Sequence, residues 1–279
     1  MRLLVTGAAG MLGQDVVRAA EAASHDVVAR ARRDLDVCDG AAVLAAVGDA
    51  RPDAVVNCAA WTDVDRAETE EAAATAVNGD AVANVARACA QAGAHLVHVS
   101  TDYVFDGRAS EPYVESSATG PLSAYGRSKL AGERAVNLER GAVVRASWLF
   151  GAGGPNFAAT MLRLARERDA VTVVDDQVGF PTYTGHLASA LLRVASGRLC
   201  GILHAGGDEP CSWHDFACAI FAASGAEMEV ARGRTADLAR PAPRPAYSVL
   251  GTERADAPRL APWRDGLAAY LDEIGAVAS

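Results

Sequence analysis

The chain has 279 residues, of which 51% are hydrophobic and 22% charged, and its 26 basic against 35 acidic side chains give a formal charge of −9. This length suits one large domain or a two-lobed unit with a substantial core, and the apolar fraction excludes a disordered chain. The acidic balance argues against nucleic acid or an anionic membrane surface as the main partner. No stretch approaches the ~20 apolar residues of a membrane helix.

The six cysteines form no CxxC pair and are irregularly spaced. This usage is typical of reduced thiols in a cytoplasmic protein rather than of a disulfide framework. The histidines likewise show no spacing that indicates metal ligands. We therefore expect a cytoplasmic protein without a metal site.

Short apolar runs alternate with helix-like segments through the first 150 residues. Strands are predicted at 3–6, 26–29, 53–57, 96–100 and 142–145, and helices at 11–23, 41–47, 72–91 and 123–138. Apolar runs with little alternation, separated by helices, are typical of a parallel sheet that is buried on both faces. We therefore predict an α/β fold with a Rossmann-type, doubly wound parallel sheet.

The pattern loosens after residue 150. A glycine-rich break is followed by predicted helices at 156–168 and 183–194 and by short strands at 171–174 and 201–205. Residues 239–248 carry three prolines and must run extended or turn. We expect residues 1–150, with a returning segment near 184–222, to form the cofactor domain. Residues 151–183 and 223–279 are expected to form a smaller α/β lobe that binds the substrate.

Gly7, Gly10 and Gly13 lie directly between the first predicted strand and the helix that begins near Met11 and Leu12. In this position, glycines allow a tight turn and let the backbone approach a pyrophosphate, whose charge meets the helix N-terminus. The spacing alone is a weak motif, but the strand before it and the helix after it are what the mechanism requires. We predict that this loop binds a dinucleotide.

The second strand ends in Arg-Ala-Arg-Arg at 30–33, without the acid that would bind the ribose 2′-hydroxyl of NAD. Arginine at this point accommodates a 2′-phosphate, so Arg30 and Arg32 favour NADPH, while NADH stays an alternative. A solvated basic loop would give the same pattern. Asp36 and Val37 follow and are expected to border the adenine.

Tyr125 and Lys129 are spaced i, i+4 on a predicted helix, and Thr101 follows the fourth strand at the edge where open α/β folds bind ligands. A Tyr-Lys pair at this spacing is common on amphipathic helices, but Thr101 adds a hydroxyl at the right edge. A free tyrosine has a pKa near 10, and a nearby ammonium is expected to lower it. The three side chains predict a proton-transfer set beside a nicotinamide.

The motifs GAAGMLG and YGRSK, together with Thr101, resemble the extended short-chain dehydrogenase/reductase family. Within it, further motifs resemble the dTDP-4-dehydrorhamnose reductases: NCAAWTDVDRAE at 57–68, STDYVFDG at 100–107, RASWLFG at 145–151, NFAATMLRLA at 156–165, DDQVGFPTY at 175–183 and RPAYSVL at 244–250. The similarity extends over nearly the whole chain.

The resemblance implies NADPH-dependent reduction of the 4-keto group of dTDP-4-dehydro-L-rhamnose, with Thr101, Tyr125 and Lys129 as catalytic residues and Tyr125 as the general acid. The second lobe would then bind a sugar nucleotide. The expected cofactor contacts are Gly7, Gly10, Met11, Leu12, Gly13, Arg30, Arg32, Asp36, Val37, Cys58, Ala59, Ala60, Ser100, Tyr125 and Lys129. The expected substrate contacts are Thr62, Val64, Thr101, Asp102, Tyr103, Trp148, Asn156 and Arg244.

Two other functions stay open: reduction of another dTDP-4-keto sugar, of the dihydrostreptose type, and a non-catalytic, NADP-binding regulatory subunit. A dehydratase is not expected, because Tyr103 stands where the resemblance places a second acid. Asn156 is equally well placed to cap a helix, and Arg244 could lie in a surface linker. The resemblance implies a homodimer, but Asp15 and His186 stand where relatives hold bridging Mg²⁺ with glutamates, which speaks against that metal site.

Overall fold

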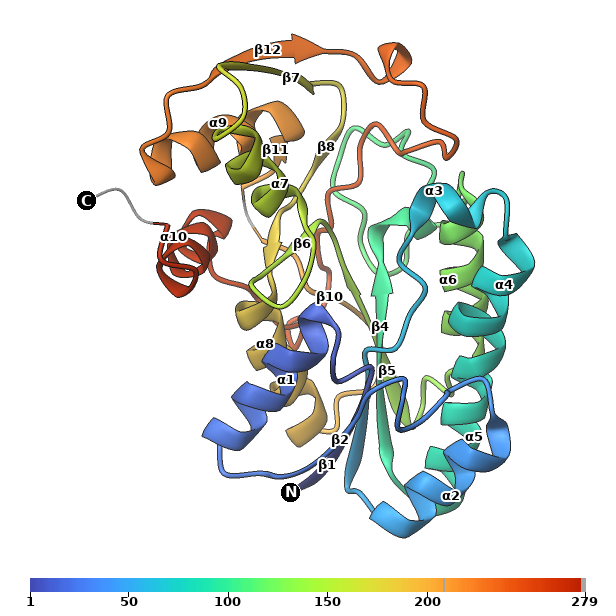
Figure 1. Ribbon diagram of the computed structural model, residues 1–279. Coiled ribbons are helices and arrows are strands. Elements are labelled where there is room, and N and C mark those ends of the chain that lie inside the picture. Colours follow the sequence, from blue (N-terminus) through green and yellow to red (C-terminus); the bar gives the residue numbers. More distant parts are fainter. Residues whose placement is uncertain (208, 277–279) are drawn as a thin grey trace.

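A computed structural model describes residues 1–207 and 209–276, and its centre is a six-stranded sheet in the order β10-β5-β4-β3-β1-β2 (Figure 1). All its neighbouring strands pair in parallel. The strands are β1 (Arg2–Thr6), β2 (Asp26–Arg30), β3 (Ala54–Asn57), β4 (His95–Thr101), β5 (Gly141–Ala146) and β10 (Gly201–His204). The predicted doubly wound α/β fold is confirmed.

Helices cover both faces of this sheet. One face carries α1 (Met11–Ala22) and α8 (Thr184–Ser196), and the other carries α2 (Gly40–Ala50), α5 (Ala81–Ala92) and α6 (Ala124–Ala135). Leu3 and Val5 of β1 pack in the core on the α1 side, whereas Leu4 packs on the α2 side. Because successive strand residues face opposite cores, the strand sequences are apolar almost without alternation.

A polar row crosses this otherwise apolar sheet. Thr6, Asn57 and His98 are in register on β1, β3 and β4 and are at most 2% exposed. The Thr6 hydroxyl donates to Asn57 Oδ1 at 2.5 Å, and Asn57 Nδ2 lies 3.1 Å from His98 Nδ1. The row is therefore hydrogen-bonded from strand to strand, which offsets much of the cost of its burial, although His98 Nε2 has no partner among the described residues.

The single helix predicted at 72–91 is wrong in one detail. The chain forms α3 (Val64–Ala67), α4 (Glu71–Thr75) and a π-helical turn at Ala76–Asp80 before α5 begins. Asn78 lies in that turn and is fully buried; its amide accepts from the Trp61 N–H at 2.8 Å and donates to Ser128 Oγ at 2.9 Å. The π turn thus connects the loop after β3 to helix α6, and π turns are frequent at functional sites.

A smaller lobe lies beside the carboxyl edge of the sheet (Figure 1). It contains α7 (Phe157–Leu164), α9 (Trp213–Ser224), α10 (Trp263–Glu273), and the strand pairs β6 (Leu149–Phe150) with β9 (Thr182–Tyr183), β7 (Ala170–Val174) with β12 (Glu229–Gly233), and β8 (Val178–Gly179) with β11 (Cys211–Ser212). Its own aromatic core includes Phe150, Phe216 and Trp263.

Helix α8 and strand β10 return to the sheet, but α9 does not follow them. Its buried side chains, among them Phe216 and Ile220, pack in the core of the smaller lobe. Of the expected returning segment at 184–222, only α8 and β10 therefore pack on the sheet. Helix α9 presents its apolar side chains to α7 and α10. We call the six strands and their five flanking helices the sheet unit; its division from the smaller lobe as separate domains stays a prediction.

Among the described residues, no helix combines the length and the apolar composition that crossing a membrane requires.

Candidate active site

The glycine loop turns sharply between β1 and α1. Gly7 has a φ of +65°, and its amide oxygen accepts from the Gly10 N–H at 2.9 Å. A Cβ at Gly7 would lie 2.6 Å from the Ala59 N and 2.7 Å from the Cys58 carbonyl carbon, and a Cβ at Gly13 would collide with the Gly7 oxygen. Only glycine satisfies both the backbone conformation and the close approach of the loop after β3.

A cavity of about 210 Å³ opens in front of this loop, which we call the first cavity. Helix α1 begins there without a side-chain cap, so its first amides are free to meet an anion. Eight predicted cofactor contacts line the cavity: Gly7, Gly10, Arg32, Asp36, Val37, Cys58, Ala59 and Ala60. Five further lining residues are not among the predicted contacts, although four of them are sequence neighbours of predicted ones: Ala9, Leu35, Cys38, Trp61 and Val77.

The remaining predicted cofactor residues lie outside the lining of the first cavity. Leu12 is 7% exposed and packs in the sheet core, and Met11 contacts the glycine-rich segment at Gly153 and Gly154. Arg30 directs Nη1 to the Ala29 oxygen at 3.4 Å.

Ser100 faces away from both the first cavity and the solvent. Its hydroxyl donates to Glu133 Oε1 at 2.5 Å, deep under helix α6. Strand alternation explains the difference, because Ser100 and Thr101 must point to opposite faces of β4.

Thr101 ends β4, Tyr125 lies beside it, and Lys129 reaches the same strand at Val99. Ser123 caps α6 by accepting the Gly126 N–H at 3.1 Å, which fixes the start of the helix that carries Tyr125 and Lys129. Lys129 is 3% exposed and donates from Nζ to the Val99 oxygen at 2.7 Å. That the three side chains act together stays a prediction.

The electrostatics of the trio differ from the expectation in one respect. Burial raises the pKa of Tyr125 to about 12, with the Thr101 hydroxyl acting in the opposite direction. Lys129 is not among the groups that shift the pKa of Tyr125; its ammonium donates to a backbone carbonyl, and burial lowers its own pKa to about 8. The predicted lowering of the tyrosine pKa is therefore wrong, because burial raises it instead.

Asp102 and Tyr103 follow Thr101 and point in different directions. Asp102 is 1% exposed, accepts from the Thr101 hydroxyl at 3.0 Å, and burial raises its pKa to about 7. Its carboxyl is therefore enclosed and does not face an open cavity. Tyr103 packs edge-on against Tyr125, with ring centroids 5.9 Å apart, and lines the larger cavity described next.

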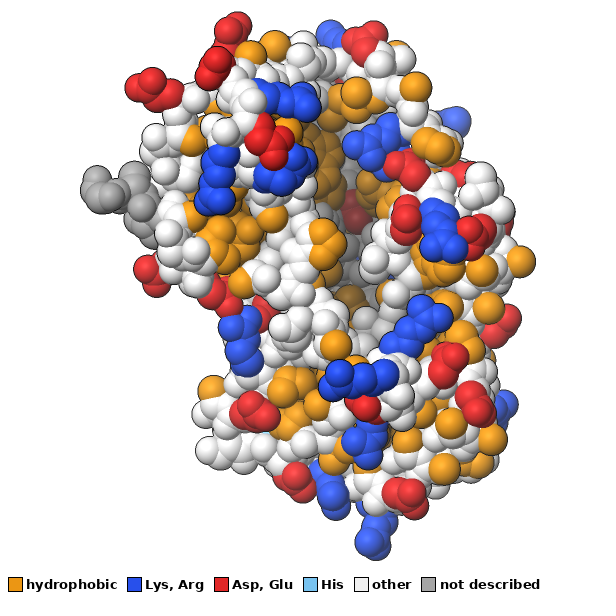
Figure 2. All heavy atoms as spheres, in the orientation of Figure 1, with side chains coloured by type: hydrophobic (Ala, Val, Ile, Leu, Met, Phe, Trp, Pro, Cys, Tyr) orange, Lys and Arg blue, Asp and Glu red, His pale blue; other side chains and the backbone are white. Residues whose placement is uncertain are grey.

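A second cavity of about 600 Å³ lies between the sheet unit and the smaller lobe, and Figure 2 shows the molecule hollowed in this region with basic side chains around the rim. Its walls come from α7, β7 and the segment 235–244, and its inner end is lined by Tyr103, Gln177 and Trp213. Arg240 and Arg244 also line it and are the basic groups nearest to an anionic ligand there.

Trp148 is held beside this region in a strained conformation. Its backbone has a φ of +47°, which is costly for a bulky side chain. Its ring is stacked on Trp213 at 3.6 Å with an angle of 8° between planes. Trp148 does not line the second cavity. Trp213 lines it and is not among the predicted substrate residues.

The other predicted substrate residues divide clearly. Asn156 caps α7 by accepting the Ala159 N–H at 2.9 Å, and its amide donates to the Gly151 oxygen at 2.8 Å, so the capping alternative holds. Thr62 is exposed and Val64 half-buried in the segment between the first cavity and α3, and neither lines the second cavity. Arg244 lines that cavity and is not in a free surface linker.

A buried cluster of charged side chains lies beneath the site. Its members are far apart in the sequence, so no local pattern predicts it. Arg145 and Glu133 are bonded bidentately at 2.9 and 2.7 Å, with side chains 2% and 4% exposed. Arg145 Nη1 lies 3.2 Å from His204 Nε2, and Ser100 completes the Glu133 bonds. The cluster ties α6 to β4, β5 and β10, so it holds the helix that bears Tyr125 and Lys129.

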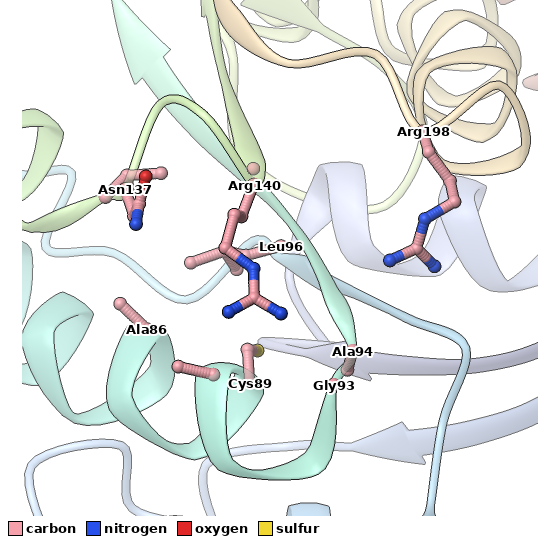
Figure 3. A pocket seen from close by; sticks show the side chains of 11 residues that line it. Ala86, Cys89, Gly93, Ala94, Leu96, Asn137, Arg140 and Arg198 are labelled. Atoms are coloured by element: carbon pink, nitrogen blue, oxygen red, sulfur yellow. The ribbon is translucent and has the colours of Figure 1, made fainter.

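A small pocket of about 70 Å³ near Cys89, Arg140 and Arg198 lies at the opposite end of the sheet (Figure 3). Ala94 and Leu96 of its lining are at the start of β4, and Thr101 is at the end of that strand. Since a strand rises about 3.3 Å per residue, the pocket is roughly 20 Å from the catalytic candidates. It takes no part in the site.

Residues 1–207 and 209–276 contain no cluster of three or more histidine, cysteine or acidic side chains that could hold a metal. Asp15, one of the two residues considered for a bridging metal, is instead paired with Arg18, whose Nη1 lies 2.5 Å from Glu273 Oε1. His186 packs edge-on against Tyr183.

The parallel sheet, the glycine turn at its first strand and the two cavities at its carboxyl edge define a Rossmann-type α/β protein. The chain belongs to the family described as the RmlD substrate binding domain, whose model matches residues 1–276.

Known relatives are similar over almost their whole length. The chain is 47% identical over 286 residues to a dTDP-4-dehydrorhamnose reductase of Streptomyces griseus, covering 99% of this chain and 94% of that protein. It is also 47% identical over 272 residues to a probable dTDP-4,6-dihydroxy-2-methyloxan-3-one 4-ketoreductase of Streptomyces antibioticus, covering 95% and 92%. A crystal structure of dTDP-4-dehydrorhamnose reductase from Bacillus anthracis in complex with NADP has a TM-score of 0.94 and 35% identity, covering 98% of this chain and 99% of that chain.

Proposed function

We propose that this protein reduces the 4-keto group of dTDP-4-dehydro-L-rhamnose with NADPH, yielding dTDP-L-rhamnose. The observation that carries the proposal lies at the carboxyl end of β4, where Lys129 donates to the Val99 oxygen and Tyr125 packs against Tyr103, a residue that lines the second cavity. The reductases of Streptomyces griseus and Bacillus anthracis support the same chemistry by similarity. We also propose that the protein is cytoplasmic and forms a homodimer that is not bridged by Mg²⁺. Neither nucleic acid nor a membrane is proposed as a partner.

The first cavity fits a dinucleotide. Gly7 and Gly13 leave room that a Cβ would fill, and the uncapped start of α1 offers amides to a pyrophosphate. Arg32 lines the same cavity and, in the described part of the chain, forms no ion pair, so its charge is available to a 2′-phosphate. When bound, NADPH supplies the hydride for the carbonyl carbon.

Tyr125 is the proposed general acid. Because burial raises its pKa to about 12, it stays protonated near neutral pH and can donate to an alkoxide that forms at the substrate oxygen. Thr101 would hydrogen-bond the same oxygen and so stabilise the negative charge that develops there. We propose that Lys129 holds the ribose of the cofactor.

The second cavity is the proposed site of the sugar nucleotide. Its apolar walls from α7 and β7 suit a base and a deoxysugar, and Arg240 and Arg244 lie on one side of it, where a diphosphate would need cations. Tyr103 joins this cavity to Tyr125, which would bring the keto carbon to the acid.

A second candidate is a reductase of another dTDP-4-keto sugar. It is favoured by the relative from Streptomyces antibioticus, which is as similar to this chain as the rhamnose-type relative is. A non-catalytic regulatory subunit is the third candidate, and the similarity to proteins named as reductases favours catalysis instead.

A product analysis tests the proposal. The purified chain is incubated with NADPH and dTDP-4-keto-6-deoxyglucose, with and without a 3,5-epimerase, and products are separated and identified. Formation of dTDP-L-rhamnose only with the epimerase supports the proposal. Reduction without the epimerase supports the second candidate, and no oxidation of NADPH with either sugar refutes the enzyme assignment.

A further inference from the structure

Asp65 accepts four hydrogen bonds from one short segment that is far away in sequence. Arg244 binds it bidentately, with Nη1 and Nη2 each 3.0 Å from a carboxylate oxygen. Arg240 Nη1 adds a bond of 3.1 Å and the Ala242 N–H one of 3.2 Å. The Asp65 and Arg244 side chains are 27% and 16% exposed, so the pair is shielded better than an ordinary surface ion pair.

On one side, Asp65 is attached rigidly to the wall of the first cavity. Trp61 lines that cavity, and its Nε1 donates to the Asp63 oxygen at 2.9 Å. Asp63 in turn caps α3 by accepting the Arg66 N–H at 3.0 Å. Only three residues, 62–64, therefore separate Trp61 on the cavity wall from Asp65, and hydrogen bonds hold this short segment.

On the other side, the segment bound by Asp65 is a wall of the second cavity. We call residues 238–244 the strap; Leu238, Arg240, Ala242, Pro243 and Arg244 line the cavity. Prolines at 241 and 243 keep it extended and remove backbone donors that could tie it down. Among the described residues, every hydrogen bond and ion pair between the strap and residues 1–150 goes to Asp65.

We propose that Asp65 is a positioning residue that couples the two cavities: a cofactor that orders the loop 58–61 fixes Asp65, and Asp65 fixes the strap in the shape that receives the sugar nucleotide. This inference rests on the proposed function, because it takes the first cavity as the cofactor site and the second as the substrate site. By thermodynamic reciprocity, the second ligand must strengthen binding of the first by the same factor.

The contact is suited to this task near neutral pH. The bonds from Arg244 lower the pKa of Asp65 to about 2, so the carboxylate keeps its charge wherever an enzyme of this kind works. Bidentate arginine–carboxylate pairs also fix orientation, which a single flexible contact would not.

Hydrogen–deuterium exchange of the whole chain tests the coupling without any substrate. In the wild type, NADPH should slow exchange at 7–13 and 58–61, and slow the strap amides by about fivefold or more. In Asp65→Asn, the first two regions should be protected as before, while the strap gains no protection. Arg240→Gln, which removes one of the four bonds, should give an intermediate result.

Glu71→Gln is the matched control. Glu71 and Arg127 form a bidentate pair of 2.7 and 2.8 Å between α4 and α6, away from the strap, so this variant should behave like the wild type. Protection at 7–13 and 58–61 without any effect on the wild-type strap would overturn the coupling while sparing the proposed cofactor site. No protection at 7–13 would overturn both.

A binding cycle with dTDP gives the second readout. In the wild type, saturating dTDP should lower the Kd of NADPH about five- to tenfold, and in Asp65→Asn this factor should fall to near one with the Kd for NADPH alone unchanged. An unchanged factor in Asp65→Asn would overturn the inference. Tighter dTDP binding by the variant would do so as well, because Asp65 would then be withholding Arg244 from the ligand.

Discussion

Replacing Lys129 by methionine should stabilise the fold while removing most of the activity. Lys129 is 3% exposed, and burial lowers its pKa from 10.5 to about 8. At about 1.4 kcal/mol per pH unit, this difference costs the folded state about 3 kcal/mol whenever the lysine is charged in both states. Methionine has a similar length and carries no charge, so the variant avoids the cost.

The pH dependence fixes the sign of this effect. Below about pH 8, the lysine is protonated in both the folded and the unfolded chain, so the full cost is present. Between about pH 8 and 10.5, the unfolded chain binds one more proton, and the stability of the wild type therefore rises with pH relative to the variant. The advantage of Lys129→Met should be about 3 kcal/mol at neutral pH and close to zero above the ordinary lysine pKa.

Urea unfolding of both proteins across this pH range measures the difference, and other titrating groups cancel in the comparison. Steady-state turnover should fall by at least about a hundredfold, as for other losses of proton-transfer groups. A variant that is less stable than the wild type at neutral pH would refute the reasoning. So would a stability difference that does not change with pH.

Three other substitutions test separate parts of the site. Tyr125→Phe should lower turnover by at least about a hundredfold, roughly 2.7 kcal/mol in the barrier, with NADPH binding by fluorescence titration unchanged; near-normal turnover would remove this residue from the acid role. Arg32→Ala should raise the KM for NADPH about tenfold or more and leave the KM for NADH unchanged. Arg33→Ala should change neither KM, because the Arg33 side chain pairs with Asp34 outside the first cavity. Arg145→Leu should lower the free energy of unfolding by about 3–5 kcal/mol because Glu133 is left buried and unpaired, and a double variant with Glu133→Leu should recover part of it; additive losses would contradict the buried-pair argument.

Features encoded within a few consecutive residues could be predicted from the sequence. The turn at Gly7 depends on its own φ and on the strand and helix beside it, so the loop was recognisable from spacing and context. Tyr125 and Lys129 share a helix, and the i, i+4 rule places them on one side of it. Arg32, Asp36 and Val37 likewise follow a strand end that the apolar pattern reveals.

Features made by distant segments could not be predicted in this way. Arg244 meets Asp65 across 179 residues of sequence, and Trp213 reaches Trp148 only because α9 packs into the smaller lobe. Ser100 shows a different limit of prediction from sequence. The motif places its backbone at the end of β4, but the strand turns its hydroxyl to Glu133, a partner that the fold brings to it. Local patterns predict a backbone position better than the direction in which a side chain is used.

The polar row of Thr6, Asn57 and His98 has a consequence for how the sheet assembles. Apolar parallel strands that slip by two residues still present apolar side chains to the same faces, so hydrophobic burial discriminates weakly between the two pairings. A slip would separate Asn57 from both partners and leave buried polar groups unbonded, at about 1–3 kcal/mol for each. Thr6 and Asn57 end their strands, and Gly7 and Cys58 follow them directly. The hydrogen-bonded row therefore fixes the register of β1 and β3. The loops that begin at Gly7 and Cys58 consequently start side by side at the same edge of the sheet.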